Sequence, residues 1–237
     1  MNLQSKTAIV TGASSGIGAT FSEALTKSGA TVFGLARNEA KLKTIAEKLG
    51  AAFIPVRMDI TKAGDLEDWV SSTFSSDSQP DILINNAGLG FYSKVDDLGV
   101  DQWDTMVQTN LSGVFYLTKV IVPLMKTNPN VCHIVNIASV AGLIGNPNFS
   151  GYNATKFGLR GFSEAIMKEL RYDGIKVTCL FPGSIQTSFF DDMDEITAHG
   201  NMMQAEDVAQ VMINVLETPD NMLIDELALR PLNPKQG

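Results

Sequence analysis

The chain has 237 residues, 44% of them hydrophobic, and a mean hydropathy of +0.06, so it can bury a sizeable core and is unlike disordered or fibrous sequences. Its 26 acidic and 18 basic residues give a net charge of -8 at pH 7. This balance disfavours nucleic acid and anionic membranes as partners, because both require a basic protein surface. A small anion can still be bound by backbone N–H groups or by a single arginine.

Cysteine usage and the absence of targeting features bear on where the protein works. Cys132 and Cys179 are far apart and do not have the spacing of metal ligands, so we expect free thiols buried in strands and no metal site. A strand-like run begins at Thr7, which leaves no room for a signal peptide. The longest apolar stretch, VIVPLM (120–125), is too short to span a bilayer. These features predict a cytoplasmic protein.

Short apolar runs rich in β-branched residues alternate with helical patterns along the chain. The runs are mostly apolar on both faces, as buried parallel strands are, and cover residues 7–11, 31–36, 52–56, 81–85, 133–138, 176–181 and 222–229. Apolar residues recur at helical spacing in 17–29 and 39–49. Repeated strand–helix alternation indicates right-handed βαβ units. No linker divides the chain, so we predict one doubly wound α/β domain over residues 1–237, with a mostly parallel seven-stranded sheet and helices on both faces.

A glycine-rich turn, VTGASSGIGATF, joins the first strand to the first helix. Gly12 permits a tight turn, Gly16 lets the backbone approach a pyrophosphate, and Gly18 lets the helix pack closely on the sheet. The helix N-terminus then presents N–H groups and a partial positive charge to the phosphates. An ordinary glycine-rich turn is the alternative, but the strand before it and the helix after it favour a dinucleotide-binding Rossmann fold.

The end of the second strand predicts which dinucleotide binds. NAD-binding folds carry an acid here for the ribose 2′-hydroxyl, but this chain has Ala36 followed by Arg37. A guanidinium can form paired hydrogen bonds to a 2′-phosphate. Because no carboxylate stands at this position, the 2′-phosphate of NADP is not repelled. We therefore predict NADP(H), with NAD(H) less favoured. The alternative is that Arg37 is a solvated loop residue.

Seven short motifs occur in a fixed order along the chain. They are TGASSGIG (11–18), MDI (58–60), NNAG (85–88), NLSG (110–113), IVNIAS (134–139), YNATK (152–156) and PGSIQT (182–187). In this order and spacing they resemble the classical short-chain dehydrogenase/reductase family over nearly the whole chain. The resemblance implies a nicotinamide-dependent oxidoreductase.

The resemblance also implies which residues bind the cofactor. The phosphates would be surrounded by Thr11, Gly12, Ser14, Ser15, Gly16, Ile17 and Gly18. Asp59 and Ile60 would hold the adenine. The floor near the adenosine ribose would be formed by Asn86, Ala87 and Gly88. The nicotinamide carboxamide would be held by Pro182, Gly183, Ile185 and Thr187.

The family's catalytic tetrad maps onto Asn110, Ser139, Tyr152 and Lys156. Carbonyl reduction builds negative charge on oxygen and then needs a proton, which a phenol of pKa about 10 can supply. Tyr152 and Lys156 are four residues apart and share one helix face, so the cation is expected to lower the phenol pKa and to bind the nicotinamide ribose. Ser139 can donate to the carbonyl oxygen. Asn110 is expected in a helix, where it would hold a water that links Lys156 to solvent.

Each tetrad residue also has a structural interpretation when it is taken alone. Tyr152 and Lys156 can be a surface pair on a helix, Ser139 a hydroxyl at a strand end, and Asn110 a capping group. Their combination behind a phosphate loop favours the catalytic interpretation.

Residues about 187–204 are predicted to form a substrate loop. The predicted pocket residues are Ser139, Tyr152, Phe91, Leu143, Phe149, Ser184 and Phe189, and most of them are apolar. They favour a small to medium carbonyl compound over a phosphorylated one. The predicted function is therefore NADP(H)-dependent interconversion of a carbonyl and a secondary alcohol.

Two alternatives stay open. A 3-oxoacyl-(acyl-carrier-protein) reductase needs a basic rim for its acidic carrier, whereas the expected edges of this site, NPN (128–130) and YDG (172–174), carry no basic residue, and Asp173 opposes such a rim. A nucleotide-binding regulator or redox sensor with little turnover commonly lacks a tetrad residue, whereas this chain keeps all four. Helix 152–171 carries apolar side chains on more than one face, which predicts a homodimer or homotetramer.

Overall fold

The computed structural model describes residues 1–187 and 200–233. Its centre is a seven-stranded sheet of order β3-β2-β1-β4-β5-β6-β7, in which every pair of neighbours is parallel. The strands are β1 (Thr7–Thr11), β2 (Thr31–Ala36), β3 (Phe53–Arg57), β4 (Ile82–Asn85), β5 (Cys132–Ile137), β6 (Ile175–Pro182) and β7 (Glu226–Leu229). The structure therefore confirms the predicted α/β sheet.

The last strand is shorter than predicted. The sequence pattern places a strand over 222–229, but pairing with β6 begins only at Glu226. The chain is still leaving a turn at Met222, because the Met222 N–H donates to the carbonyl oxygen of Pro219.

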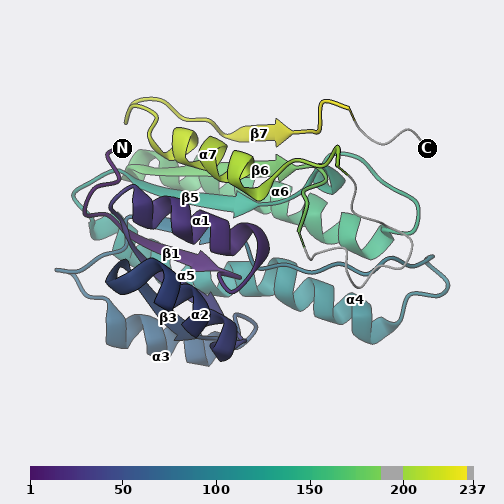
Figure 1. Cartoon of the computed structure of the whole chain (residues 1–237), viewed down its shortest axis with the longest axis horizontal. Coiled ribbons are helices and arrows are strands. Elements are labelled where there is room, and N and C mark those ends of the chain that lie inside the picture. The colour runs from purple at the N-terminus through teal and green to yellow at the C-terminus, as the bar shows by residue number, and fades with distance from the viewer. Residues whose placement is uncertain (188–199, 234–237) are drawn as a thin grey trace.

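Helices cover both faces of the sheet (Figure 1). One apolar cluster joins the sheet to α1 (Gly16–Lys27), α2 (Glu39–Leu49) and α7 (Ala205–Leu216). A second cluster, on the other face, joins it to α3 (Ala63–Thr73), α5 (Gly113–Thr127) and α6 (Ser150–Leu170).

Residues of β1 show how the sequence produces these two layers. Ala8 and Val10 belong to the first cluster, whereas Ile9 between them belongs to the second, because successive strand residues point to opposite faces. Both faces are dry, so the strand is apolar throughout. Cys132 in β5 and Cys179 in β6 are free and buried, as predicted.

The order of the strands also predicts where a ligand binds. From β1 the chain proceeds outward to β2 and β3, and then returns to the other side of β1 as β4. In doubly wound sheets this switch opens a crevice beyond the carboxyl ends of the central strands. Within residues 1–187 and 200–233, no helix has both the length and the apolar character needed to cross a membrane.

Candidate active site

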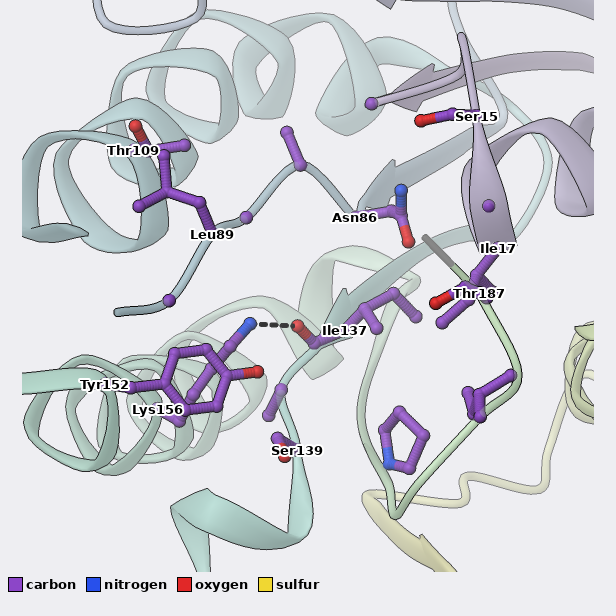
Figure 2. Close-up of a pocket in the computed structure, with 18 of the residues that line it drawn as sticks. Ser15, Ile17, Asn86, Leu89, Thr109, Ile137, Ser139, Tyr152, Lys156 and Thr187 are labelled. Atoms are coloured by element: carbon purple, nitrogen blue, oxygen red, sulfur yellow. Dashed lines mark hydrogen bonds between the residues drawn. The ribbon is translucent and has the colours of Figure 1, made fainter. Parts of the chain in front are cut away.

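A cavity of about 1310 Å³ lies along the carboxyl edge of the sheet. Pockets for a single small ligand are typically about 300–1,000 Å³, so this one has room for a dinucleotide and a second molecule. Figure 2 shows Ser15, Ile17 and Thr187 on one side of it and Tyr152, Lys156 and Ser139 on the other.

The glycine-rich turn has the geometry that an anion site requires. Gly12 has φ +67°, a left-handed conformation that glycine adopts without strain. A Cβ on Gly18 would lie 2.3 Å from the carbonyl oxygen of Gly12, so only glycine allows α1 to begin this close to the turn. Ser15 makes no side-chain capping bond and the first turn of α1 contains no acid, so the helix N–H groups face the cavity without a protein anion. These donors fit a pyrophosphate.

Five of the seven predicted phosphate-loop residues line the cavity, and two lie beneath it. The lining residues are Gly12, Ser14, Ser15, Gly16 and Ile17. Thr11 instead braces the loop, because its hydroxyl oxygen accepts hydrogen bonds of 2.9 Å from the backbone N–H groups of Asn86 and Ala87. Gly18 packs against this same loop junction.

Arg37, Asp59 and Ile60, which are predicted to contact the adenosine part of the cofactor, line the end of the cavity beyond β2 and β3. Burial alone would raise the pKa of Asp59, but hydrogen bonds from Thr61 and the charge of Arg37 lower it on balance. Sequence reasoning missed Lys41, which also lines this end and lies in the first turn of α2, four residues after Arg37. Its place at the start of the helix that follows Arg37 is the signal that would have found it.

The other predicted cofactor residues meet on the opposite side of the switch point. The lining residues there are Asn86, Ala87, Gly88, Pro182, Gly183, Ile185 and Thr187. They come from the segment that follows β4, from the last residue of β6 and from the segment after it. One motif residue has a different role: the Asn85 side-chain amide donates to Asn136 of β5 at 2.8 Å and to Thr118 of α5 at 3.2 Å. This buried contact ties the two central strands to a helix below the cavity.

Tyr152 and Lys156 lie on α6, and Ser139 follows β5. A hydrogen bond joins Ser139 to Tyr152, and the Lys156 Nζ atom donates to the Ile137 carbonyl oxygen at 2.9 Å. Contrary to the sequence-based expectation, the pKa of Tyr152 is not lowered on balance, because burial raises it to about 12 against the opposing effect of the bond to Ser139. Burial also lowers the pKa of Lys156 to about 8, so this side chain loses its positive charge more readily than an exposed lysine does. The sequence-based expectation relied on that charge to lower the pKa of the phenol.

Asn110 lies in a π-helical turn, Gln108–Ser112, between α4 (Val100–Val107) and α5. Its side chain is fully buried and bonds to both backbone groups of Leu89 and to the Thr155 hydroxyl. Both amide hydrogens are therefore used within the protein, and the side chain holds the segment after β4 against α6. The predicted bound water would have to be held by a carbonyl oxygen of Asn110, and this role stays a prediction.

The predicted substrate residues separate into three groups. Phe91, Phe149 and Ser184 line the cavity together with Ser139 and Tyr152. Leu143 does not, because it follows the short helical turn Val140–Gly142 and packs against the apolar cluster around Leu159 and Phe181. Phe189 and most of the predicted loop 187–204 lie outside the described residues. Sequence reasoning missed Tyr92, Gln102 and Asn146, which also line the cavity.

No group of three or more His, Cys, Asp or Glu side chains within the described part of the chain could hold a metal ion. His133 is buried in β5 away from the cavity, and its Nε2 atom lies 2.8 Å from the Thr178 hydroxyl.

Comparison with known proteins agrees with this geometry. An uncharacterized oxidoreductase of Staphylococcus epidermidis is 32% identical over 97% of this chain and 99% of its own length. A 3-ketoacyl-(acyl-carrier-protein) reductase from Brucella melitensis, solved with NADH, superposes with a TM-score of 0.89 at 28% identity, over 96% of this chain and 97% of that one. A serine dehydrogenase solved with NADP+ gives 0.85 at 26% identity, over 94% of each chain. A family model described as short chain dehydrogenase matches residues 6–197, and the protein therefore belongs to that family of oxidoreductases.

Proposed function

We propose that this oxidoreductase uses NADP(H) to interconvert a carbonyl group and a secondary alcohol on a small to medium molecule. The observation that carries the proposal is the position of Tyr152 on the cavity wall, hydrogen-bonded to Ser139 and with Lys156 beneath its ring. A phenol that is buried, protonated and adjacent to an ammonium group suits proton transfer to a carbonyl oxygen.

In the proposed reaction the protein supplies one proton to the carbonyl oxygen of the substrate. When bound, the reduced cofactor supplies a hydride to the carbonyl carbon. Tyr152 is protonated at neutral pH, because burial raises its pKa to about 12, and it gives this proton to the carbonyl oxygen. The Ser139 hydroxyl oxygen accepts from the Ala141 N–H at 3.1 Å, so its own hydrogen can be donated as charge grows on the substrate. The ammonium of Lys156 then stabilises the phenolate.

Two cations support a preference for NADP(H) over NAD(H). Arg37 and Lys41 both line the adenosine end of the cavity, and Ala36 occupies the end of β2 where an acid would repel a 2′-phosphate. The proposed acceptor of that phosphate is the pair of side chains, with Arg37 able to form two parallel hydrogen bonds.

Further properties of the chain belong to the same proposal. We infer that residues 1–237 form one catalytic domain that works in the cytoplasm.

We also infer a homodimer or homotetramer, because Phe115 of α5 is 47% exposed and Phe157 of α6 is 43% exposed. Burying these rings against a second copy would remove apolar surface from water. Light scattering is expected to give at least a dimer at micromolar concentration, and a monomer would contradict the inference.

The reaction is tested by following the loss of reduced-cofactor absorbance with a panel of ketones, aldehydes and 3-oxoacyl thioesters. Reduction of free ketones or aldehydes supports the proposal. Exclusive use of carrier-linked thioesters would favour the acyl-carrier alternative. Binding of NADPH without turnover of any compound would favour a regulatory protein.

A further inference from the structure

Three aromatic rings form a continuous wall on the catalytic side of the cavity. The ring of Tyr92 meets that of Phe149 edge-on, with 5.0 Å between the centroids, and the ring of Phe149 lies 6.0 Å from that of Tyr152. All three line the cavity. We call Tyr92 and Phe149 the aromatic wall, since they extend the surface of the proposed proton donor.

Asn148 holds this wall together. Its carbonyl oxygen accepts a 2.7 Å hydrogen bond from the Ser93 N–H, and its side-chain amide donates to the Tyr92 hydroxyl at 2.8 Å. Its φ is +64°, a left-handed conformation that asparagine tolerates better than most residues. A backbone held in this sparsely populated region beside a catalytic group is typical of a functional constraint. The segment after β4 is thereby fixed to the segment before α6, at the point where the two rings touch.

Neither residue of the aromatic wall carries a charge, and the charged side chains that line the cavity come from other segments. Among the described lining residues the charged side chains are Arg37, Lys41, Asp59 and Lys156. The first three belong to the adenosine end, beyond β2 and β3, and Lys156 donates to the Ile137 carbonyl oxygen. Near the aromatic wall the polar lining residues are uncharged, namely Gln102 and Asn146. Among the described lining residues, the cation on the catalytic side of the cavity is therefore Lys156, which lies beneath the Tyr152 ring and already donates to the Ile137 carbonyl oxygen, so a substrate carboxylate or phosphate packed on Tyr92 and Phe149 gains no ion pair from them.

We propose that the substrate is an uncharged carbonyl compound that carries an aryl ring or a similar planar group next to its carbonyl, and that this group packs against the aromatic wall. The inference rests on the proposed carbonyl reduction and names its substrate class. Aromatic rings attract one another in edge-on and offset arrangements, which gives a planar substituent an advantage over an alkyl chain. Asn148 acts as a positioning residue, because it reaches the substrate only through Tyr92.

The test compares three probes with NADPH: acetophenone, a straight-chain alkyl methyl ketone of the same carbon count, and benzoylformate, an aryl ketone that carries a carboxylate. The expected kcat/KM is about tenfold higher for acetophenone than for the alkyl ketone, as one favourable ring contact provides. Benzoylformate is expected to be the poorest probe. Equal use of the two neutral ketones, or preference for benzoylformate, overturns the inference while leaving carbonyl reduction intact.

Variants then identify the wall as the source of the preference. Tyr92→Ala is expected to reduce the ratio of aryl to alkyl kcat/KM to about one, chiefly through a higher KM for acetophenone. Tyr92→Phe keeps the ring but loses the hydroxyl that binds Asn148, so it is expected to keep only part of the ratio, as Asn148→Gly is. Tyr172→Ala is the matched control, because Tyr172 is 88% exposed in the short helical turn Arg171–Asp173 after α6 and does not line the cavity. An equal loss for both ketones in Tyr92→Ala contradicts the inference.

Asn148→Gly separates positioning from general stability, since glycine accepts φ +64° but lacks the amide that binds Tyr92. It is expected to lower the aryl to alkyl ratio without a matching fall in kcat for the alkyl ketone. An unchanged ratio excludes Asn148 as a positioning residue.

If the wild-type protein reduces no ketone, the proposed function fails. The wall is then tested by calorimetric titration of acetophenone with NADP+ present, where no binding, or equal binding to Tyr92→Ala, overturns it.

Discussion

The Nζ atom of Lys156 lies 5.6 Å from the centre of the Tyr152 ring, one helical turn away on α6. The same atom donates to the Ile137 carbonyl oxygen, so a backbone group of β5 fixes the ammonium below the ring. Burial dominates the titration of both groups, since it lowers the pKa of Lys156 to about 8 and raises the pKa of Tyr152 to about 12. At neutral pH the phenol of Tyr152 is therefore protonated, and Lys156 carries a positive charge that it loses at slightly higher pH.

This arrangement predicts how carbonyl reduction depends on pH. The kcat/KM for reduction is expected to fall above about pH 8, because Lys156 loses the charge that stabilises the developing phenolate. A pH profile of kcat/KM with NADPH measures the effect. In Lys156→Arg the side chain stays charged, so the fall is expected to move to higher pH even if the maximal rate is lower. A fall that remains near pH 8 in that variant would assign the titration to another group.

The choice of cofactor is predicted to depend on Arg37 and Lys41. Replacing Arg37 by Ala is expected to lower kcat/KM for NADPH by about 10- to 100-fold, the value of a charge-assisted hydrogen bond, while NADH is little affected. Lys41→Ala is expected to act in the same direction with a smaller effect. Initial rates with both cofactors measure the change.

Lys43→Ala provides the matched control for these cofactor variants. Lys43 lies on α2, as Lys41 does, but it pairs with Glu39 and does not line the cavity. It is expected to leave the cofactor preference unchanged. If the wild-type protein uses NADH better than NADPH, or if Arg37→Ala alters both cofactors equally, the proposed preference is wrong.

His133 predicts a loss of stability in acid. Burial lowers its pKa to about 3, so the folded protein keeps the imidazole neutral while the unfolded chain takes up a proton below about pH 6.5. The unfolded state then binds more protons, and the free energy of unfolding falls by roughly 1 kcal/mol for each pH unit as the pH drops below 6.5.

Urea unfolding of the wild type and of His133→Leu at neutral pH and near pH 5 measures this contribution. The Thr178 hydroxyl keeps the Ile224 carbonyl as its acceptor in the variant, so its hydrogen is not left unpaired. His133→Leu is expected to lose less stability on acidification than the wild type. Parallel losses in the two proteins would show that other groups cause the acid sensitivity.

The fold was accessible from the sequence because its determinants are local. Strand–helix alternation predicted all seven strands, and β7 begins four residues later than expected because the turn at Met222 precedes it. The phosphate loop was equally accessible, because Gly12 is required by a left-handed backbone conformation and Gly18 by the close packing of α1 on the turn. The four tetrad positions came from motif order, and the structure brings them close together around Gly88 and Ile137.

Other features depend on contacts between distant segments. The aromatic wall requires Tyr92 and Phe149 to meet through Asn148, and no periodicity in the sequence joins them. Leu143 was assigned to the pocket from its place after Ser139, but it packs against Leu159 and Phe181 instead. The raised pKa of Tyr152 was also missed, because spacing on a helix indicates a neighbouring charge but not the depth of burial.

The most direct test of the proposed reaction is the kcat of Tyr152→Phe with NADPH and the best ketone of the panel. The phenol hydroxyl is removed while the ring and its contact with Phe149 are kept. The account predicts a loss of about 10²–10⁴-fold, the usual contribution of a general acid, with the dissociation constant for NADPH almost unchanged. Turnover close to that of the wild type would contradict the assignment of Tyr152 as the proton donor.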